Sequence, residues 1–351
     1  MNSAGLVDLQ VNGFAGIDFN RGAGLSGADI DTAMEALLAT GVTCLLPTII
    51  TASALQLEAR FAALDAAISA SRLGAAMCPG YHLEGPFLNP ADGFAGCHPA
   101  AVMTAPDYRL VERLERELAR PILLITIAAE LPGAAGFIRQ ARAAGKLVAI
   151  GHSAADFGEV EAAADAGASL ATHLGNGLPQ SLPKLANPIM AQLAEDRLCA
   201  SFIADGIHIP RQALKVLIRA AGPGRAILVT DAVAAAAAPA GLYPFAGMTV
   251  QRDEGGTVRL PGQVGLAGSA LCLDAAVRNL VAWGIASPAE AFAMASTRPA
   301  ALLAPALAAH GLTHDPGALV WSEGLTLGRL RLGAIERIFA SPHLQESLHV
   351  A

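Results

Sequence analysis

Residues 145–176 read GKLVAIGHSAADFGEVEAAADAGASLATHLGN and hold two apolar segments separated by an Ala-rich stretch. We expect strands at 147–152 and 169–173, with a helix between them. Continuous apolar strands that alternate with helices are typical of a parallel sheet covered on both faces. Each of the two strands ends in a histidine, His152 and His173. This unit therefore predicts both a fold class and a place where polar side chains gather.

The same strand and helix pattern recurs along the chain. Helical stretches include 29–41 and 134–146. Six further strands are expected at 6–11, 43–49, 77–84, 122–128, 199–204 and 226–231. Eight such units predict an α/β protein with a closed (β/α)8 TIM-type barrel, for which about 250 residues is usual. A doubly wound open sheet is the alternative.

The alternation stops after the eighth strand. We predict a barrel domain over 1–305 with a small hairpin inserted near 248–260, around two adjacent glycines. Strand-like runs after residue 317 predict a β-rich tail, 306–351, as a reduced accessory β-element. The segment AVAAAAAPAG, 232–241, is expected to be an Ala-rich surface loop.

Composition and charge exclude several classes of function. The chain is 53% apolar and 15% charged, which fits a large buried core, and its net charge is −7 without a basic run. We therefore expect no nucleic-acid partner. No stretch resembles a membrane span or a secretion signal, so no membrane partner is expected. Five cysteines without a CxxC pair favour reduced thiols and a cytoplasmic location.

Ligand-type side chains stand at the ends of four predicted strands: Glu84, His152, His173 and Asp231. In a barrel of this type the carboxyl ends of the strands form the active site. Two imidazoles and a carboxylate are a three-ligand set for catalytic zinc, and Fe²⁺ is also compatible with it. We keep Asp231 apart from the metal set as the general acid and base.

Several motifs together resemble a known family. GYHLEGPFLNP, GHSAA, THLGNGLP, ADGIH, LVTDA and LAGSALCLDAAVRNLV follow in order between about residues 7 and 303. They are similar to the N-acetylglucosamine-6-phosphate deacetylases of the amidohydrolase superfamily. The resemblance implies a metal-dependent barrel that hydrolyses the acetamide of N-acetylglucosamine 6-phosphate, releasing acetate and glucosamine 6-phosphate.

The resemblance also implies residue roles. Glu84, His152 and His173 would hold the metal, with Asp231 as acid and base, and His98 would help to polarise the substrate carbonyl. The positions that match substrate contacts are Cys97, His98, Asn176, Gly177, Asp205, Gly206, Ile207, His208, Leu266, Ala267 and Gly268. Cys97 is also a conceivable nucleophile, although a small packed thiol is the simpler interpretation.

The sequence departs from the family pattern in three places. Gln10 and Asn12 stand where many amidohydrolases carry two histidines, and because neutral amides are poor metal ligands we predict one divalent metal ion per chain. Lys184 stands where the family carries an arginine that reaches phosphate, and it either binds phosphate as a point charge or is an ordinary solvated lysine. The chain starts close to the first strand, so the tail strands should lack partners and favour a homodimer.

Other functions remain open at this stage. The same chemistry could act on another N-acetylated sugar or amino acid without a phosphate requirement. A catalytically silent barrel that serves as a binding subunit is a second alternative, although the intact ligand set argues against it. A nicotinamide or flavin enzyme is not supported, because no GxGxxG follows the first strand.

Overall fold

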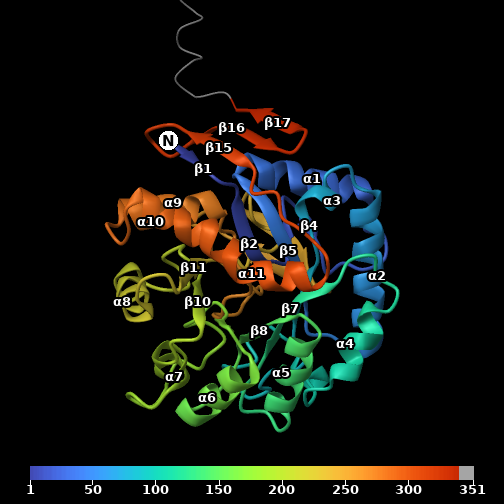
Figure 1. Ribbon diagram of the computed structural model, residues 1–351, viewed down its shortest axis with the longest axis vertical. Coiled ribbons are helices and arrows are strands. Elements are labelled where there is room, and N and C mark those ends of the chain that lie inside the picture. Colours follow the sequence, from blue (N-terminus) through green and yellow to red (C-terminus); the bar gives the residue numbers. More distant parts are fainter. Residues whose placement is uncertain (340–351) are drawn as a thin grey trace, which may run out of the picture.

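The computed structural model describes residues 1–339 and contains an eight-stranded parallel barrel (Figure 1). Neighbouring strands in the sheet are also consecutive among the barrel strands along the chain. The strands are β2 (Leu6–Val11), β5 (Val42–Ile50), β6 (Tyr81–Glu84), β7 (Ile122–Ile127), β8 (Leu147–Ile150), β9 (Leu170–Ala171), β10 (Cys199–Phe202) and β11 (Ala226–Leu228). Each strand except β10 is buried at every position, as expected when helices cover a parallel sheet.

Hydrogen bonds between the end of β2 and the segment that follows β11 close the barrel. The Asp231 N–H donates to the Gln10 carbonyl at 3.0 Å, and the Asn12 N–H donates to the Ala232 carbonyl at 2.7 Å. Below them, the buried carboxylate of Asp8 accepts a hydrogen bond from the Thr230 hydroxyl at 2.6 Å. The predicted barrel is therefore confirmed, and the open-sheet alternative is wrong.

The carboxyl group of Asp8 makes stability depend on pH, because burial raises its pKa from 3.8 to about 7. The folded protein holds this proton more tightly than the unfolded chain, so the free energy of unfolding falls as pH rises through this window. The asparagine of Asp8→Asn does not titrate, so this variant should not lose stability in this way. Relative to the wild type, we expect its free energy of unfolding to increase by roughly 2–3 kcal/mol between pH 5 and pH 8, measured by thermal unfolding. Asp196→Asn, at an exposed carboxylate, is the control. A gap between wild type and Asp8→Asn that stays constant with pH would contradict the assignment.

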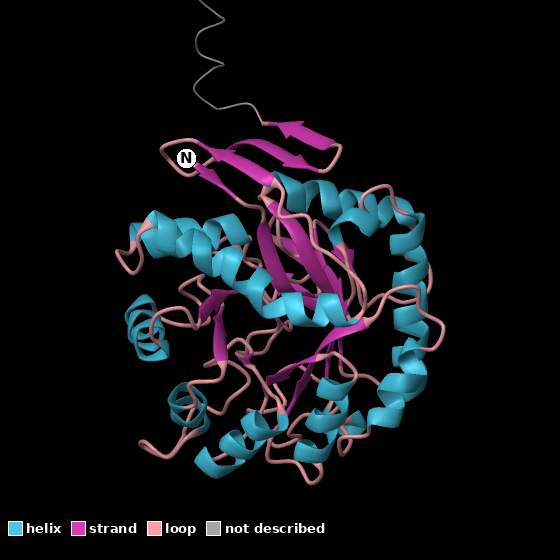
Figure 2. Cartoon of the chain, viewed as in Figure 1, coloured by secondary structure: helices cyan, strands magenta, loops and turns pink. Residues whose placement is uncertain are grey.

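Helices surround the barrel (Figure 2). Several begin at residues whose side chains cap the first turn, and Ser26, Ser53 and Asp156 each form a capping box. The helices are α1 (Gly27–Ala39), α2 (Ala54–Ala70), α3 (Gly74–Met77), α4 (Tyr108–Glu115), α5 (Ala134–Ala143), α6 (Phe157–Ala166), α7 (Pro188–Ala194), α8 (Arg211–Ala221), α9 (Leu273–Ala282), α10 (Pro288–Ala295) and α11 (Thr297–Ala309), with a 3₁₀ turn at Ala100–Val102.

The strand predicted at 77–84 begins only at Tyr81. Residues before it form the short helix α3, because the Ser71 hydroxyl accepts the N–H groups of Leu73 at 3.1 Å and Gly74 at 2.8 Å. This side-chain cap favours a turn over an extended chain.

The Ala-rich segment after β11 is buried rather than exposed, so the prediction of a surface loop is wrong for residues 232–236. Its small side chains let the backbone approach the chain after β2, where Ala15 and Gly16 donate to the carbonyls of Ala236 at 2.8 Å and Ala234 at 2.7 Å. The short strands β3 (Gly13–Phe14) and β4 (Ile17–Asp18) form there.

An antiparallel sheet follows this segment and contains the predicted hairpin. Strands β13 (Met248–Arg252) and β14 (Val258–Arg259) pair as expected, and β12 (Gly241–Phe245) adds a third strand. The sheet carries its own apolar cluster, which joins Phe245 and Val250 to Ile50 at the end of β5. The cluster therefore fixes this sheet beside the mouth of the barrel.

A four-stranded antiparallel sheet lies at the top of the view in Figure 1. The N-terminal strand β1 (Asn2–Ser3) joins β15 (Ala318–Trp321), β16 (Leu327–Leu332) and β17 (Ile335–Ile338). Helix α11 crosses residue 305, the predicted end of the barrel domain. We therefore propose that the boundary between the barrel domain and the tail lies after this helix. Residues 340–351 of the predicted tail lie outside the described residues. Across residues 1–339, no helix has the length and apolar character that crossing a bilayer requires.

Candidate active site

A cavity of about 390 Å³ opens at the carboxyl ends of the barrel strands, where the sequence placed the site. It brings together most of the predicted residues. Those that line it are Glu84, Cys97, His98, His152, His173, Asn176, Gly177, His208, Asp231, Leu266 and Gly268.

Three of the lining residues have strained backbones. His152, His173 and Asp231 have φ values of 51°, 31° and 50°, in the left-handed region that residues other than glycine rarely adopt. Each follows a barrel strand within three residues. Backbone strain of this kind concentrates at functional sites, where the surrounding structure holds it in place. The backbone conformation therefore indicates a functional site at these three strand ends, independently of the side chains found there.

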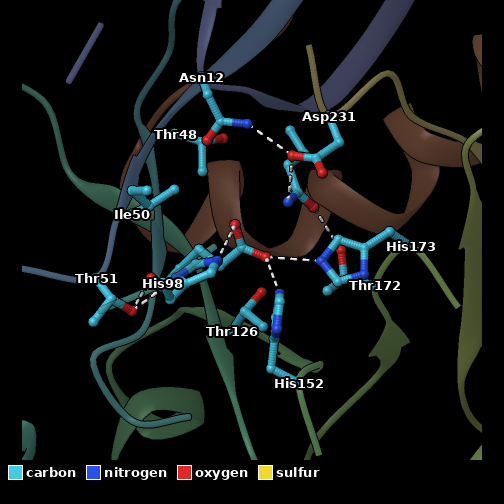
Figure 3. A network of polar contacts seen from close by, with 12 residues as sticks. Asn12, Thr48, Ile50, Thr51, His98, Thr126, His152, Thr172, His173 and Asp231 are labelled. Atoms are coloured by element: carbon cyan, nitrogen blue, oxygen red, sulfur yellow. Dashed lines mark hydrogen bonds and ion pairs between the residues drawn. The ribbon is translucent and has the colours of Figure 1, made fainter. Parts of the chain in front are cut away.

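Three imidazoles converge on the buried carboxylate of Glu84 (Figure 3). The Nε2 atoms of His173 and His152 lie 2.9 and 3.5 Å from Oε1 of Glu84. The Nε2 atom of His98 lies 3.7 Å from Oε2. Ligand atoms of Glu84, His98 and His152 all lie within 4.8 Å of one another.

Hydrogen bonds on the far side of two rings decide which nitrogen carries the proton. His152 Nδ1 lies 2.7 Å from the Phe94 carbonyl, which can only accept, so Nδ1 carries the hydrogen. The Thr51 hydroxyl donates to the Glu84 carbonyl at 3.2 Å and therefore accepts from His98 Nδ1 at 2.9 Å. In neutral rings, both Nε2 atoms then present lone pairs to a carboxylate.

Lone pairs that face a carboxylate oxygen repel it, and a cation bound between them would turn this repulsion into attraction. Nitrogen and carboxylate donors in this arrangement fit a divalent transition metal, and the outer hydrogen bonds of both rings are those that orient metal-binding histidines. The residues that present these donors are Glu84, His98 and His152, which include two of the three ligands expected from the sequence. The third expected ligand, His173, lies beside this group with its Nε2 atom 2.9 Å from Glu84 Oε1, so the side chains at this end of the cavity fit a divalent metal.

Charge in the site is set by burial and by the imidazoles. Burial acts to raise the pKa of Glu84, but the surrounding imidazoles, with His173 Nε2 the nearest at 2.9 Å, outweigh it and hold the pKa well below the usual value. Glu84 is therefore ionised at neutral pH. Burial lowers the pKa of His98 to about 3, so this ring is neutral.

Asp231 is held by the two amides that replace the histidines expected on the first strand. Gln10 Nε2 and Asn12 Nδ2 donate to the same oxygen, Oδ1, at 3.0 and 2.7 Å. This leaves Oδ2 without a hydrogen-bond partner among residues 1–339 and available to a reacting group. Burial, followed by the charge of Glu84, raises the pKa of Asp231. A raised carboxyl pKa inside a cavity is typical of an acid–base group.

Five predicted contact residues do not line the cavity. Asp205 lies behind His208 and accepts from its Nδ1 at 2.6 Å, so it orients the imidazole that does line the cavity. Lys184 is exposed. The other three are Gly206, Ile207 and Ala267.

Cys97 lies in the cavity wall, and burial raises its thiol pKa to about 12. Such a thiol is not a nucleophile at neutral pH, in agreement with the simpler interpretation of this residue.

Several residues of the site were not singled out from the sequence. Ile50, Gln180, Phe245 and Gln263 line the cavity. Thr51, which orients His98, directly follows the second barrel strand, and that position could have drawn attention to it. Gln180 directly follows the THLGNGLP motif, so its place in the chain could have drawn attention to it, whereas Gln263 lies in a loop before the LAGSALCLDAAVRNLV motif.

Gly85 is required where the chain turns after Glu84. Its φ is +81°, and a Cβ at this position would lie 2.1 Å from Thr51 Oγ1, the hydroxyl that orients His98. We expect Gly85→Ala to cost at least about 1–2 kcal/mol from the left-handed backbone alone, with the clash added, measured by thermal unfolding. Gly136→Ala is the matched control, because no atom lies within 4 Å of that helical position. Equal melting of both variants would contradict this role of Gly85.

Known proteins resemble the chain over most of its length. It is 34% identical to N-acetylgalactosamine-6-phosphate deacetylase of Escherichia coli O157:H7, over 85% of this chain and 76% of the relative. It is 33% identical to N-acetylglucosamine-6-phosphate deacetylase of Bos taurus, over 85% and 73%. The crystal structure of the Mycobacterium smegmatis N-acetyl-D-glucosamine-6-phosphate deacetylase aligns with a TM-score of 0.84 at 26% identity, over 96% of this chain and 88% of that one. The Pasteurella multocida enzyme aligns at 0.83 and 26%, over 96% and 86%. No family model matches.

Proposed function

Since the chain belongs to the N-acetylglucosamine-6-phosphate deacetylase family of the amidohydrolase superfamily, we propose that it hydrolyses the acetamide of N-acetylglucosamine 6-phosphate. The products are glucosamine 6-phosphate and acetate. The observation that carries the proposal is one cavity in which Glu84 faces three imidazole nitrogens while Asp231 offers a free carboxylate oxygen. This arrangement supports amide hydrolysis and not a silent barrel.

Glu84, His152 and His173 would hold one divalent cation, with zinc favoured over iron by the ligand types. Such a cation supplies Lewis-acid chemistry, which lowers the pKa of water to about 7. The Nε2 atom of His98 faces Oε2 of Glu84, whereas that of His173 faces Oε1. We assign His98 to the substrate and not to the metal. If the Thr51 hydroxyl turns to donate to Nδ1, His98 carries its hydrogen on Nε2 and can donate it to the amide carbonyl oxygen.

Asp231 moves the proton. Its Oδ2 accepts a proton from the attacking water as the oxygen adds to the carbonyl carbon. When the carbon–nitrogen bond breaks, Asp231 returns this proton to the leaving amine. Gln10 and Asn12 keep the other oxygen occupied, so the same atom takes and gives the proton.

The remaining site residues are proposed substrate contacts. Asn176, Gly177, His208, Leu266 and Gly268 line the same cavity as the metal-binding residues, and we propose that they hold the sugar. Lys184 is proposed as a phosphate contact for a neighbouring subunit, because it does not line the cavity of its own chain.

We also propose a homodimer in the cytoplasm. Within the described residues, β17 is the outer strand of its sheet, and an outer strand can pair with a second copy. All five cysteines are free, which supports a reducing compartment.

The galactosamine epimer is a second candidate substrate. The relative from Escherichia coli O157:H7, at 34% identity, is an N-acetylgalactosamine-6-phosphate deacetylase. The two sugars differ at one hydroxyl, so the same catalytic residues would serve either.

The deciding experiment measures acetate release by purified protein of known metal content. The substrates are N-acetylglucosamine 6-phosphate, its galactosamine epimer and unphosphorylated N-acetylglucosamine. Preference for the first with about one metal per chain supports the proposal. Preference for the epimer reassigns the sugar. Equal rates on the phosphorylated and unphosphorylated sugars would show that the protein has no phosphate site. If metal-loaded protein released acetate from none of the substrates, the proposed activity would be wrong.

A further inference from the structure

One carboxylate outside the cavity joins three of the loops that follow barrel strands. Glu130 lies three residues after β7, is half-buried and does not line the cavity. Its Oε1 accepts from Asn89 Nδ2 at 2.8 Å and from the Ala154 N–H at 2.7 Å. Its Oε2 accepts from the Ser153 hydroxyl at 2.5 Å. The partners come from the loops after β6 and β8, so Glu130 links both to its own loop.

The three contacts lie beside His152, on the C-terminal side of its backbone. Ser153 and Ala154 directly follow it, and the Asn89 N–H donates to the His152 carbonyl at 3.2 Å. The Ser153 hydroxyl also accepts the N–H groups of Ala129 and Ala155, each at 3.2 Å. The His152 carbonyl and the backbone that follows it are therefore fixed by polar contacts.

His152 needs such support because its φ of 51° is strained. A residue in this conformation persists only when its surroundings determine it, and relaxation would move the imidazole away from Glu84. The hydrogen bonds to Glu130 involve an ionised acceptor and are stronger than neutral ones. The Glu130 carboxylate therefore supplies the strong hydrogen bonds that can hold the strained backbone of His152 in place.

We propose that Glu130 is a positioning residue for the metal site, which holds His152 in its metal-binding orientation through Ser153, Ala154 and Asn89. The inference rests on the metal-dependent function proposed above. It assigns a role to a carboxylate that contacts neither substrate nor metal. Loss of an outer partner of a metal ligand typically costs about 10–100-fold in metal affinity, and we expect a loss of this size.

The test measures the affinity of the metal-free protein for Zn²⁺ by competition with a coloured chelator. Glu130→Ala should bind Zn²⁺ about 10–100-fold more weakly than the wild type. Glu130→Gln should fall between them, because its amide oxygen can still accept from Asn89 and Ala154. Glu112→Ala, at an exposed glutamate of α4, is the matched control and should bind as the wild type does. Circular dichroism and thermal unfolding of the metal-free variants show whether the fold is kept.

Unchanged Zn²⁺ affinity in a folded Glu130→Ala would overturn the proposal. If that variant does not fold, Ser153→Ala takes its place and must weaken Zn²⁺ binding for the proposal to stand. This substitution removes the contact with Glu130 Oε2 together with the acceptor of the Ala129 and Ala155 N–H groups. Failure of the wild type itself to bind Zn²⁺ would count against the proposed function instead, so the two failures are distinguishable.

Discussion

Asp231→Asn should lower kcat for acetate release by about 10²–10⁴-fold while the variant still binds one metal ion. The amide oxygen of the variant can replace Oδ1 and accept from Gln10 and Asn12, so its –NH₂ group takes the position of Oδ2. That group cannot accept a proton from water. Asparagine also tolerates the left-handed backbone, with φ of 50°, better than most residues, so the fold should be kept.

The measurement combines steady-state kinetics on N-acetylglucosamine 6-phosphate with metal analysis of the same sample. KM should change little, because the acid–base step belongs to the transition state. Asp196→Asn, at an exposed carboxylate, should keep full activity. A substantial kcat in Asp231→Asn would remove Asp231 from the acid–base role, and loss of metal would show that it contributes to binding.

The barrel was predictable because its strands are apolar throughout and its helices begin and end at polar signals. Strand β2 spans Leu6–Val11, as predicted. Strand β5 is one residue longer at each end than the predicted 43–49, whereas the six strands after it are shorter than predicted. Strands β8 and β11 end at Ile150 and Leu228, before the site residues that the prediction included. The left-handed conformations of His152 and Asp231 take the chain out of the sheet ladder, and no sequence pattern reveals a positive φ in a residue other than glycine.

The ligand types at the strand ends were readable, whereas the groups that orient them were not. Glu84 drew attention as a carboxylate in an apolar chain. Thr51 and Glu130 act through hydrogen bonds between residues far apart in sequence, which only the folded chain brings together. The Ala-rich segment after β11 was misplaced because alanine fits a surface loop as well as a close backbone contact.

Glu84→Gln should abolish stabilisation of the protein by Zn²⁺ without destabilising the metal-free form. A neutral amide is a poor ligand, so the cation loses its anionic partner. In the metal-free variant the new –NH₂ group can donate to the Nε2 lone pair of His98 if it replaces Oε2, or to that of His152 if it replaces Oε1, and either lone pair faces an acceptor in the wild type. We therefore expect metal-free Glu84→Gln to melt at or above the temperature of the metal-free wild type.

Thermal unfolding with and without Zn²⁺ tests both halves of this expectation. At a Zn²⁺ concentration about 1,000 times Kd, binding stabilises the wild type by about 4 kcal/mol, and the variant should show no such gain. Glu161→Gln, at an exposed glutamate of α6, should respond as the wild type does. An equal Zn²⁺ response in Glu84→Gln would place the cation elsewhere. A metal-free variant that melts well below the wild type would mean that Glu84 is held by imidazole N–H donors, and the inferred proton positions on His98 and His152 would be wrong.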